Sequence, residues 1–243
     1  MELHIYKDPA EVSKQLAAWI ALQIETTLQQ KDRFTWVVTG GNSPKQLYEL
    51  LAGAPYKDRI DWSKLHIFWG DERAVPFDDS RNNAKMTFDH LLNKVPVVRE
   101  QVHIMDTSLA PEESAKAYEA ILHRYFGNEG PSFDLVLNGM GDDGHTLSLF
   151  PHTPVIHEQN DWVTAFYLSA QEMYRITLTA PIVNRAQNVA FLTFGENKAK
   201  ALFEVMKGAT NIDLYPSQII QPVNGHLHWF VDEAAAELVK KAE

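Results

Sequence analysis

The sequence predicts an α/β protein, with one domain over residues 1–243 and a largely parallel sheet that carries helices on both faces. Short apolar runs typical of buried strands alternate along the chain with segments of helical periodicity. Such alternation favours parallel strands covered by helices. Several strand-like runs end in glycine-rich polar loops. The sequence shows no internal repeat, low-complexity tract or linker, so we expect one domain.

The expected elements begin with a long helix, for which Asp8 is the N-cap and Pro9 the first residue. Apolar residues recur at every fourth position and form one stripe: Val12, Leu16, Ile20, Ile24 and Leu28. Strands are expected at 34–39, 65–69, 133–138, 162–168, 174–179 and 189–194. Further helices are expected from Pro44, at 111–126 and at about 196–206, before a final strand and helix at 227–242.

The composition excludes several classes of protein. The net charge of −10 argues against a nucleic-acid-binding surface, which needs a basic face. No stretch approaches the roughly 18 apolar residues of a membrane span, and the first residues lack the pattern of a signal peptide. Without cysteine there is no disulfide framework and no thiolate metal site. We therefore expect a cytoplasmic protein that binds neither membrane nor nucleic acid.

Three polar loops follow predicted strands: GGNSPK at 40–45, GDERAVP at 70–76 and GMGDDGH at 139–145. In open parallel sheets, ligands bind outside the carboxyl ends of the strands. Because these loops should meet at that edge, the sequence predicts the functional site there.

The first loop has the composition of a phosphate-binding turn. Gly40 and Gly41 allow the backbone to approach a ligand, and Asn42 or Ser43 can cap the helix expected at Pro44. An ordinary strand-to-helix turn would look the same, so this loop alone does not decide. The spacing also differs from that of a Walker loop.

The second loop places Asp71 and Glu72 beside Arg73. Either carboxylate could hold the guanidinium while it points at a substrate oxygen. A surface salt bridge is the equally good alternative.

The third loop is the most informative, because Asp142 and Asp143 precede His145 directly after a strand. An imidazole with a carboxylate to orient it makes a general base. An acidic turn with a capping histidine is the less favoured alternative. The spacing fits neither a calcium loop nor a zinc site, so no metal is expected.

Two cations complete the candidate site. Arg175 begins an alternating apolar strand, and Lys198 lies in the first turn of a helix, where a cation opposes the helix dipole. An anionic ligand would explain Lys198, although a solvated lysine is the commoner case. His66 is expected to pack inside a strand, and His226 and His228 have no assigned role.

With these segments in view, the chain resembles the 6-phosphogluconolactonase family, part of a superfamily shared with the glucosamine-6-phosphate isomerases. The matching motifs are TGGNSP (39–44), DERAVP (71–76) with Asn82-Asn83, GMGDDGHTLSLFP (139–151), RITLT (175–179) and GENKA (195–199). Departures are Asn42-Ser43 for Ser-Thr, Asn82 for serine, and Leu147 for a small alanine, which indicates altered packing beneath the loop.

The resemblance implies a Rossmann-like sheet and, in the oxidative pentose phosphate pathway, hydrolysis of 6-phospho-D-glucono-1,5-lactone without metal or cofactor. It implies that His145 is the general base, that Asp143 orients it, and that Arg73 stabilises substrate or oxyanion charge. The residues that bind the substrate and its phosphate would be Gly40, Gly41, Asn42, Ser43, Asp71, Arg175 and Lys198, with the phosphate held by the loop from Gly40 to Ser43 and by the two cations. The expected partner is a sugar phosphate, and the protein is expected to be a monomer or weak homodimer.

Two alternatives remain open. A glucosamine-6-phosphate deaminase or isomerase would share the fold and a DGH loop, but that group follows DGH with an IAFNEP-like segment and lacks Arg73. A non-catalytic sugar-phosphate sensor is the other alternative. No helix-turn-helix precedes residue 34, which argues against the sensors that are attached to DNA-binding modules.

Overall fold

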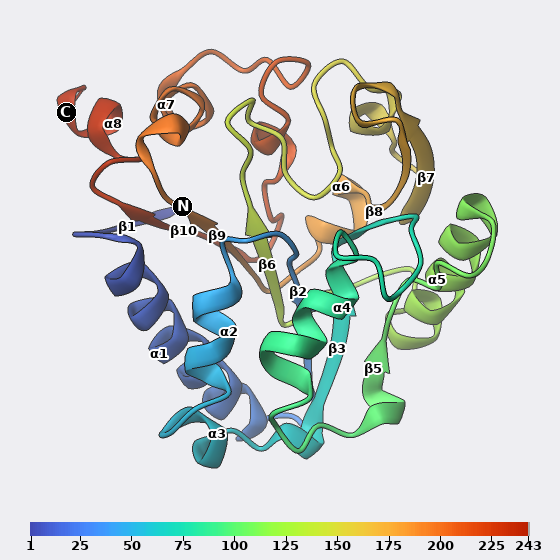
Figure 1. Ribbon diagram of the computed structural model, residues 1–243. Helices are drawn as coiled ribbons and strands as arrows, with labels where there is room; N and C mark the ends of the chain where they lie inside the picture. The colour runs from blue at the N-terminus through green and yellow to red at the C-terminus, as the bar shows by residue number, and fades with distance from the viewer. Residues whose placement is uncertain (243) are drawn as a thin grey trace.

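The computed structural model describes residues 1–242, and within them the main sheet has seven strands in the order β1-β10-β9-β6-β2-β3-β5. Every neighbouring pair in this sheet is parallel (Figure 1). The strands are β1 (Glu2–Tyr6), β2 (Phe34–Val38), β3 (Leu65–Trp69), β5 (Val102–His103), β6 (Leu135–Gly139), β9 (Asn188–Thr193) and β10 (His226–Asp232). The predicted fold class is confirmed, whereas the assignment of residues 1–243 to one domain stays a prediction.

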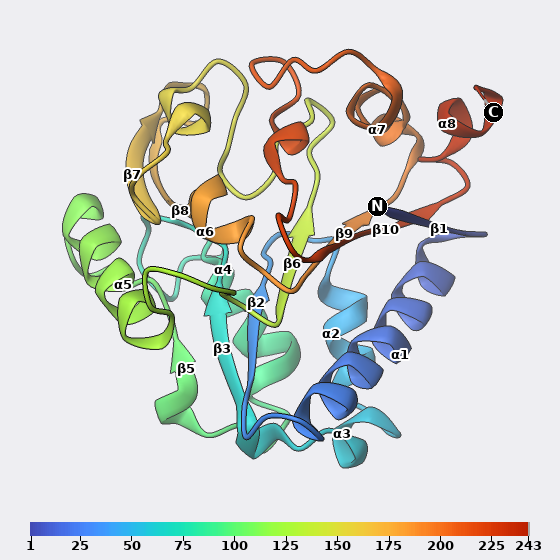
Figure 2. The ribbon, with the colours of Figure 1, turned by 180° about the vertical axis from the view of Figure 1, so that it is seen from behind.

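Helices cover both faces of this sheet (Figures 1 and 2). They are α1 (Pro9–Leu28), α2 (Lys45–Leu51), α3 (Tyr56–Arg59), α4 (Asn83–Thr87), α5 (Pro111–Tyr125), α6 (Ala180–Val183), α7 (Ala199–Lys207) and α8 (Glu237–Lys241). As predicted, Asp8 caps α1, because its side chain accepts a hydrogen bond from the backbone amide of Glu11 at 2.9 Å. The α1 stripe is buried from Val12 to Ile24.

The strands divide their side chains between two apolar layers, because successive residues of a strand point to opposite faces. Trp36 and Val38 of β2 belong to the layer that contains residues of α1, α2 and α4, whereas Val37 between them belongs to the layer that contains residues of α5 to α8. All three side chains are fully buried. A strand buried on both faces reads as a continuous apolar run, which is why 34–39 was recognisable from sequence.

A second, three-stranded antiparallel sheet corrects the expectation for the segment 71–76. Its order is β4-β8-β7, with β4 at Asp71–Arg73, β8 at Met173–Leu178 and β7 at Val163–Leu168. We expected a strand-end loop at 71–76, but β4 pairs with β8 directly after the chain leaves β3 at Gly70. A three-residue strand is too short to show an alternating pattern, so no periodicity marked β4 in advance.

The strand order reverses between β2 and β6, since β3 and β5 follow on one side and β9 and β10 on the other. Ligands of open α/β sheets bind at such a reversal, outside the carboxyl ends of the strands. No helix within residues 1–242 is long and apolar enough to cross a membrane.

Candidate active site

A cleft of about 240 Å³ lies at the reversal between β2 and β6. It is lined by the loop after β2, the end of β6 and the loop that follows it, and residues from β4, β8 and the turn before α7. Residues predicted from sequence that line it are Gly40, Gly41, Asn42, Ser43, Asp71, Arg73, His145, Arg175 and Lys198. Five separate chain segments thus meet at this cleft, among them the three loops that were predicted to lie at this edge of the sheet.

The histidine in the cleft is oriented by Asp143. Nδ1 of His145 lies 2.6 Å from Oδ1 of Asp143, and the backbone amide of His145 donates to the same oxygen at 3.1 Å. The Phe150 ring stacks on the imidazole, with centroids 4.1 Å apart. Gly141 leaves the room for this arrangement, because a Cβ there would lie 2.1 Å from Nδ1. Asp142 is exposed and makes no such contact, so only Asp143 is placed to orient the imidazole.

The environment of Asp143 favours its ionised form. Partial burial raises the pKa of this carboxyl. The hydrogen bonds and the charge of His145 together lower it by more, so the net pKa is below the ordinary value. Asp143 is therefore an ionised acceptor for the imidazole across the neutral pH range.

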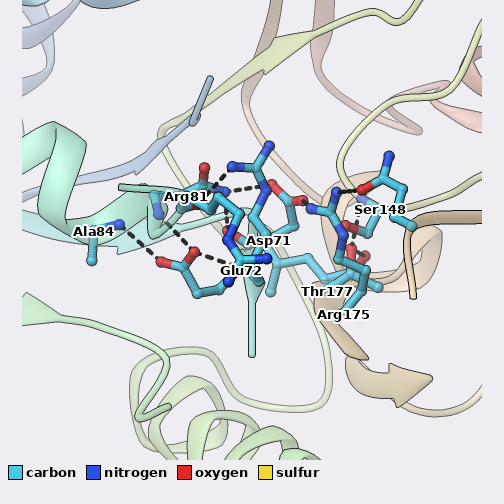
Figure 3. A network of polar contacts seen from close by, with 11 residues as sticks. Asp71, Glu72, Arg81, Ala84, Ser148, Arg175 and Thr177 are labelled. Carbon is cyan, nitrogen blue, oxygen red and sulfur yellow. Dashed lines mark hydrogen bonds and ion pairs between the residues drawn. The ribbon is translucent and has the colours of Figure 1, made fainter. Parts of the chain in front are cut away.

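A network of polar contacts surrounds Asp71, whose side chain points to the opposite side of β4 from the side chain of Glu72 (Figure 3). Ser148 Oγ donates to Oδ2 of Asp71 at 2.5 Å, and Nη1 of Arg175 lies 3.6 Å from the same oxygen. Gln171 accepts a hydrogen bond from Nη2 of Arg175. The Arg175 side chain is only 4% exposed, and burial lowers its pKa while the Asp71 charge opposes that shift. Arg175 is thus a buried cation that is paired with Asp71 and also lines the cleft.

Arg73 is not held as we predicted. The carboxylate of Glu72 accepts from the backbone amides of Arg73, Asn83 and Ala84 at 2.7–2.9 Å, not from the Arg73 guanidinium. The guanidinium instead donates to the backbone carbonyl of Arg81 at 2.7 Å. Alternation along β4 explains this, because Glu72 points towards the start of α4 and away from its neighbours. The Nε atoms of Arg73 and Arg175 are buried without a hydrogen-bond partner among residues 1–242.

The loop after β2 also differs in one respect. Neither Asn42 nor Ser43 caps α2, whose N-cap is Pro44 without a side-chain hydrogen bond. The turn closes through its backbone, with the amide of Lys45 donating to the carbonyl of Asn42 at 3.3 Å. The side chains of Asn42 and Ser43 are therefore not occupied in capping the helix.

Two glycines of this region are fixed by close neighbours. A Cβ on Gly40 would lie 1.9 Å from Oδ1 of Asn83, and one on Gly70 would lie 2.5 Å from Cδ2 of Leu147. Leu147 itself has a φ of +54°, in the left-handed region that costs a leucine energy. The side chain of Leu147 thus lies against the backbone of Gly70.

Three residues that contact side chains of the cleft were missed individually. Ser148 and Phe150 lie within the quoted motif GMGDDGHTLSLFP, but the sequence does not show that one contacts Asp71 and the other His145. Gln171 precedes β8 in a segment without any motif, and only the structure places it on Arg175.

Comparison with known proteins identifies relatives of this chain. The profile of the family described as glucosamine-6-phosphate isomerases/6-phosphogluconolactonase matches residues 7–229. A 6-phosphogluconolactonase of Synechocystis sp. is 39% identical over 222 residues, covering 90% of each chain. The structure of a 6-phosphogluconolactonase from Trypanosoma cruzi matches with a TM-score of 0.86 and 27% identity, covering 97% of this chain and 96% of that one. A monomeric glucosamine-6-phosphate deaminase matches with a TM-score of 0.84 but 18% identity, which shows the shared fold alone.

Proposed function

Because this chain belongs to the glucosamine-6-phosphate isomerase/6-phosphogluconolactonase family, we propose that it hydrolyses 6-phospho-D-glucono-1,5-lactone to 6-phospho-D-gluconate. Such an enzyme is a carboxylic ester hydrolase. The observation that carries the proposal is the pairing of His145 with Asp143 in a cleft that also contains Arg73, Arg175 and Lys198. A base beside several cations suits an anionic ester substrate.

The deaminase alternative is less well supported. The chain has the segment TLSLFP after DGH, and its Ser148 and Phe150 contact Asp71 and His145. Arg73, which the deaminase group lacks, lines the cleft. The 18% identity to the deaminase carries no argument about chemistry.

The substrate phosphate is assigned to the loop from Gly40 to Ser43, with Lys198 and Arg175 as its cations. All of these residues line one cleft. Backbone amides of a glycine-rich turn and nearby cations are groups that bind phosphate in proteins.

The reaction proceeds through one histidine. Neutral His145, with Nδ1 held by Asp143, uses Nε2 to take a proton from water as that water attacks the lactone carbonyl. Arg73 stabilises the negative charge that develops on the carbonyl oxygen. The bond from the carbonyl carbon to the ring oxygen then breaks, and His145 returns its proton to that oxygen. Protons therefore balance over the cycle without metal or organic cofactor.

Four further parts of the proposal concern the pathway, the compartment, the oligomeric state and the absence of nucleic-acid binding. We place the enzyme in the oxidative pentose phosphate pathway of the cytoplasm, as a monomer or weak homodimer. The net charge of −10 supports a protein that does not bind nucleic acid.

The test is a direct assay of purified protein against 6-phosphogluconolactone and glucosamine 6-phosphate, with and without chelator. We expect lactone hydrolysis above the spontaneous rate, undiminished by chelator, and no ammonia release from the amino sugar. Deaminase activity alone would contradict the assignment, and absence of both activities with retained sugar-phosphate binding would favour a sensor. Activity that chelator abolishes and a divalent ion restores would contradict the metal-free mechanism.

A further inference from the structure

A cluster of two histidines and a carboxylate lies outside the cleft, on the edge of the main sheet. Glu2 and His4 belong to β1, and His228 belongs to β10. Figure 1 shows these two strands side by side, and their register pairs Glu2 with His228. Because residues two apart share a face of a strand, the parallel pairing brings the three side chains together.

The ligand atoms form a nearly equilateral triangle. Nε2 of His4 lies 3.4 Å from Nδ1 of His228 and 3.7 Å from Oε2 of Glu2, and the last two atoms are 3.5 Å apart. Bonds of 2.0–2.1 Å to a tetrahedral Zn²⁺ place neighbouring ligand atoms about 3.3–3.4 Å apart. An octahedral ion with bonds of similar length would need about 3.0 Å. The spacing therefore fits a tetrahedral ion.

The two imidazoles are held in place by aromatic neighbours. Phe230 stacks on His4 with ring centroids 4.5 Å apart, and Trp19 of α1 packs against His228 at 4.8 Å. The His228 side chain is 8% exposed, whereas Glu2 is accessible to solvent. Rings fixed by packing hold their nitrogens in place before an ion arrives, and the exposed carboxylate can close over it.

We propose that Glu2, His4 and His228 bind a divalent transition metal, for which zinc is the best fit, and that this ion clamps β1 to β10. The fourth ligand position is open to water, as in other three-ligand zinc sites. None of the three residues lines the active-site cleft. They lie on β1 and the first half of β10, whereas Asp232, at the other end of β10, contacts the amide of Gly195 beside the Lys198 turn. The ion therefore acts on stability and takes no part in lactone hydrolysis.

Zinc binding is measured on the purified chain after removal of any affinity tag, by calorimetry and by thermal unfolding. At a zinc concentration about 100 times Kd, we expect Tm to rise by about 5–10 °C with kcat unchanged. Co²⁺ in the same site should give the intense visible absorption of four-coordinate cobalt. A protein whose Tm does not respond to zinc, or a weak six-coordinate cobalt spectrum, would overturn the proposal.

Variants identify the site. His4→Gln and, independently, Glu2→Gln should each weaken zinc binding by at least about 10–100-fold. His157→Gln is the matched control, because it removes a histidine that contacts the carboxylate of Asp213 elsewhere on the surface, at 3.0 Å. His145→Gln tests whether zinc binds at the active site instead. Wild-type zinc affinity in His4→Gln and Glu2→Gln, or loss of binding in His145→Gln, would refute the assignment.

Discussion

The loop that carries His145 and the network around Asp71 face the same cleft but are built in opposite ways. The contact between His145 and Asp143 spans two residues of sequence, and both side chains are partly exposed, at 28% and 45%. Asp71 and its partners Ser148 and Arg175 come from segments up to 104 residues apart, and both Asp71 and Arg175 are buried. Substitutions in the loop should therefore alter catalysis with little effect on stability, whereas substitutions in the network should alter both.

The largest expected effect tests the loop. His145→Gln should lower kcat by about 10²–10⁴-fold, because a positioned base contributes that range. Its free energy of unfolding should change by no more than about 0.5 kcal/mol, since the ring is partly exposed. The measurements are steady-state kinetics, corrected for spontaneous hydrolysis, and urea unfolding.

For this variant, near-normal binding of 6-phosphogluconate is the control for an intact cleft. The pH profile of kcat/KM in the wild type should contain a limb for deprotonation of one group, and that limb should vanish. Wild-type kcat in a folded His145→Gln protein would remove histidine from the mechanism.

Substitution in the network around Asp71 should reduce the free energy of unfolding, which substitution of His145 should leave almost unchanged. Arg175→Ala leaves the Asp71 carboxylate buried without its cation, so we expect a loss of about 3–5 kcal/mol in the free energy of unfolding. Urea unfolding measures this loss, with Lys198→Ala as the control because Lys198 is only partly buried and should cost little. Equal stability of the two variants would show that the buried pair does not support the fold.

The phosphate contact is the next smaller effect. Lys198→Ala should reduce kcat/KM for the phosphorylated lactone relative to unphosphorylated gluconolactone. The reduction should correspond to a loss of about 1.5–3 kcal/mol in binding free energy, the usual cost of a lost hydrogen bond to a charged group. Arg175→Ala should lower the same ratio. The ratio of the two substrates cancels changes in protein stability, and an unaltered ratio in both variants places the phosphate elsewhere.

The smallest effect is a contrast in pH dependence. Burial raises the pKa of Glu72 to about 7, although three backbone amides donate to it. The folded chain then holds this proton more tightly than the unfolded chain, so the stability that Glu72 contributes is present below about pH 4.5 and is lost as pH rises through about 7. The lowered pKa of Asp143 has the reverse sign, and its contribution is lost as pH falls below its ordinary value near 3.8.

Urea unfolding at a series of pH values separates these two contributions. Glu72→Gln should reduce the change in the free energy of unfolding between about pH 4.5 and 7. Asp143→Asn should alter the pH dependence of this free energy only at acid pH. An unchanged slope in Glu72→Gln would show that the folded chain keeps this carboxylate ionised.

Local patterns were sufficient to predict the loop but not the network. The parallel strands and His145 follow from apolar runs and from glycine-punctuated motifs, which are properties of short segments. The pairing of β4 with β8 joins residues about 100 positions apart, so the strand at Asp71 could not be read from sequence. The cluster of Glu2, His4 and His228 was missed for the same reason. The contacts of Arg73 with Arg81 and of Arg175 with Gln171 are short in sequence, but they depend on side-chain directions that no motif marks.

The seating of Leu147 over Gly70 has a consequence for how this family can vary. A Cβ at position 70 would need the space that Cδ2 of Leu147 occupies, so a residue larger than glycine at 70 requires the Leu147 side chain to move or to be smaller. An alanine at 147 would open room for a larger residue at 70, whereas the reverse order passes through a clash at the junction of β3 and β4. Substitution of Leu147 by a smaller residue should therefore precede substitution of Gly70 by a larger one, and related chains should show covariation of residue size at the two positions.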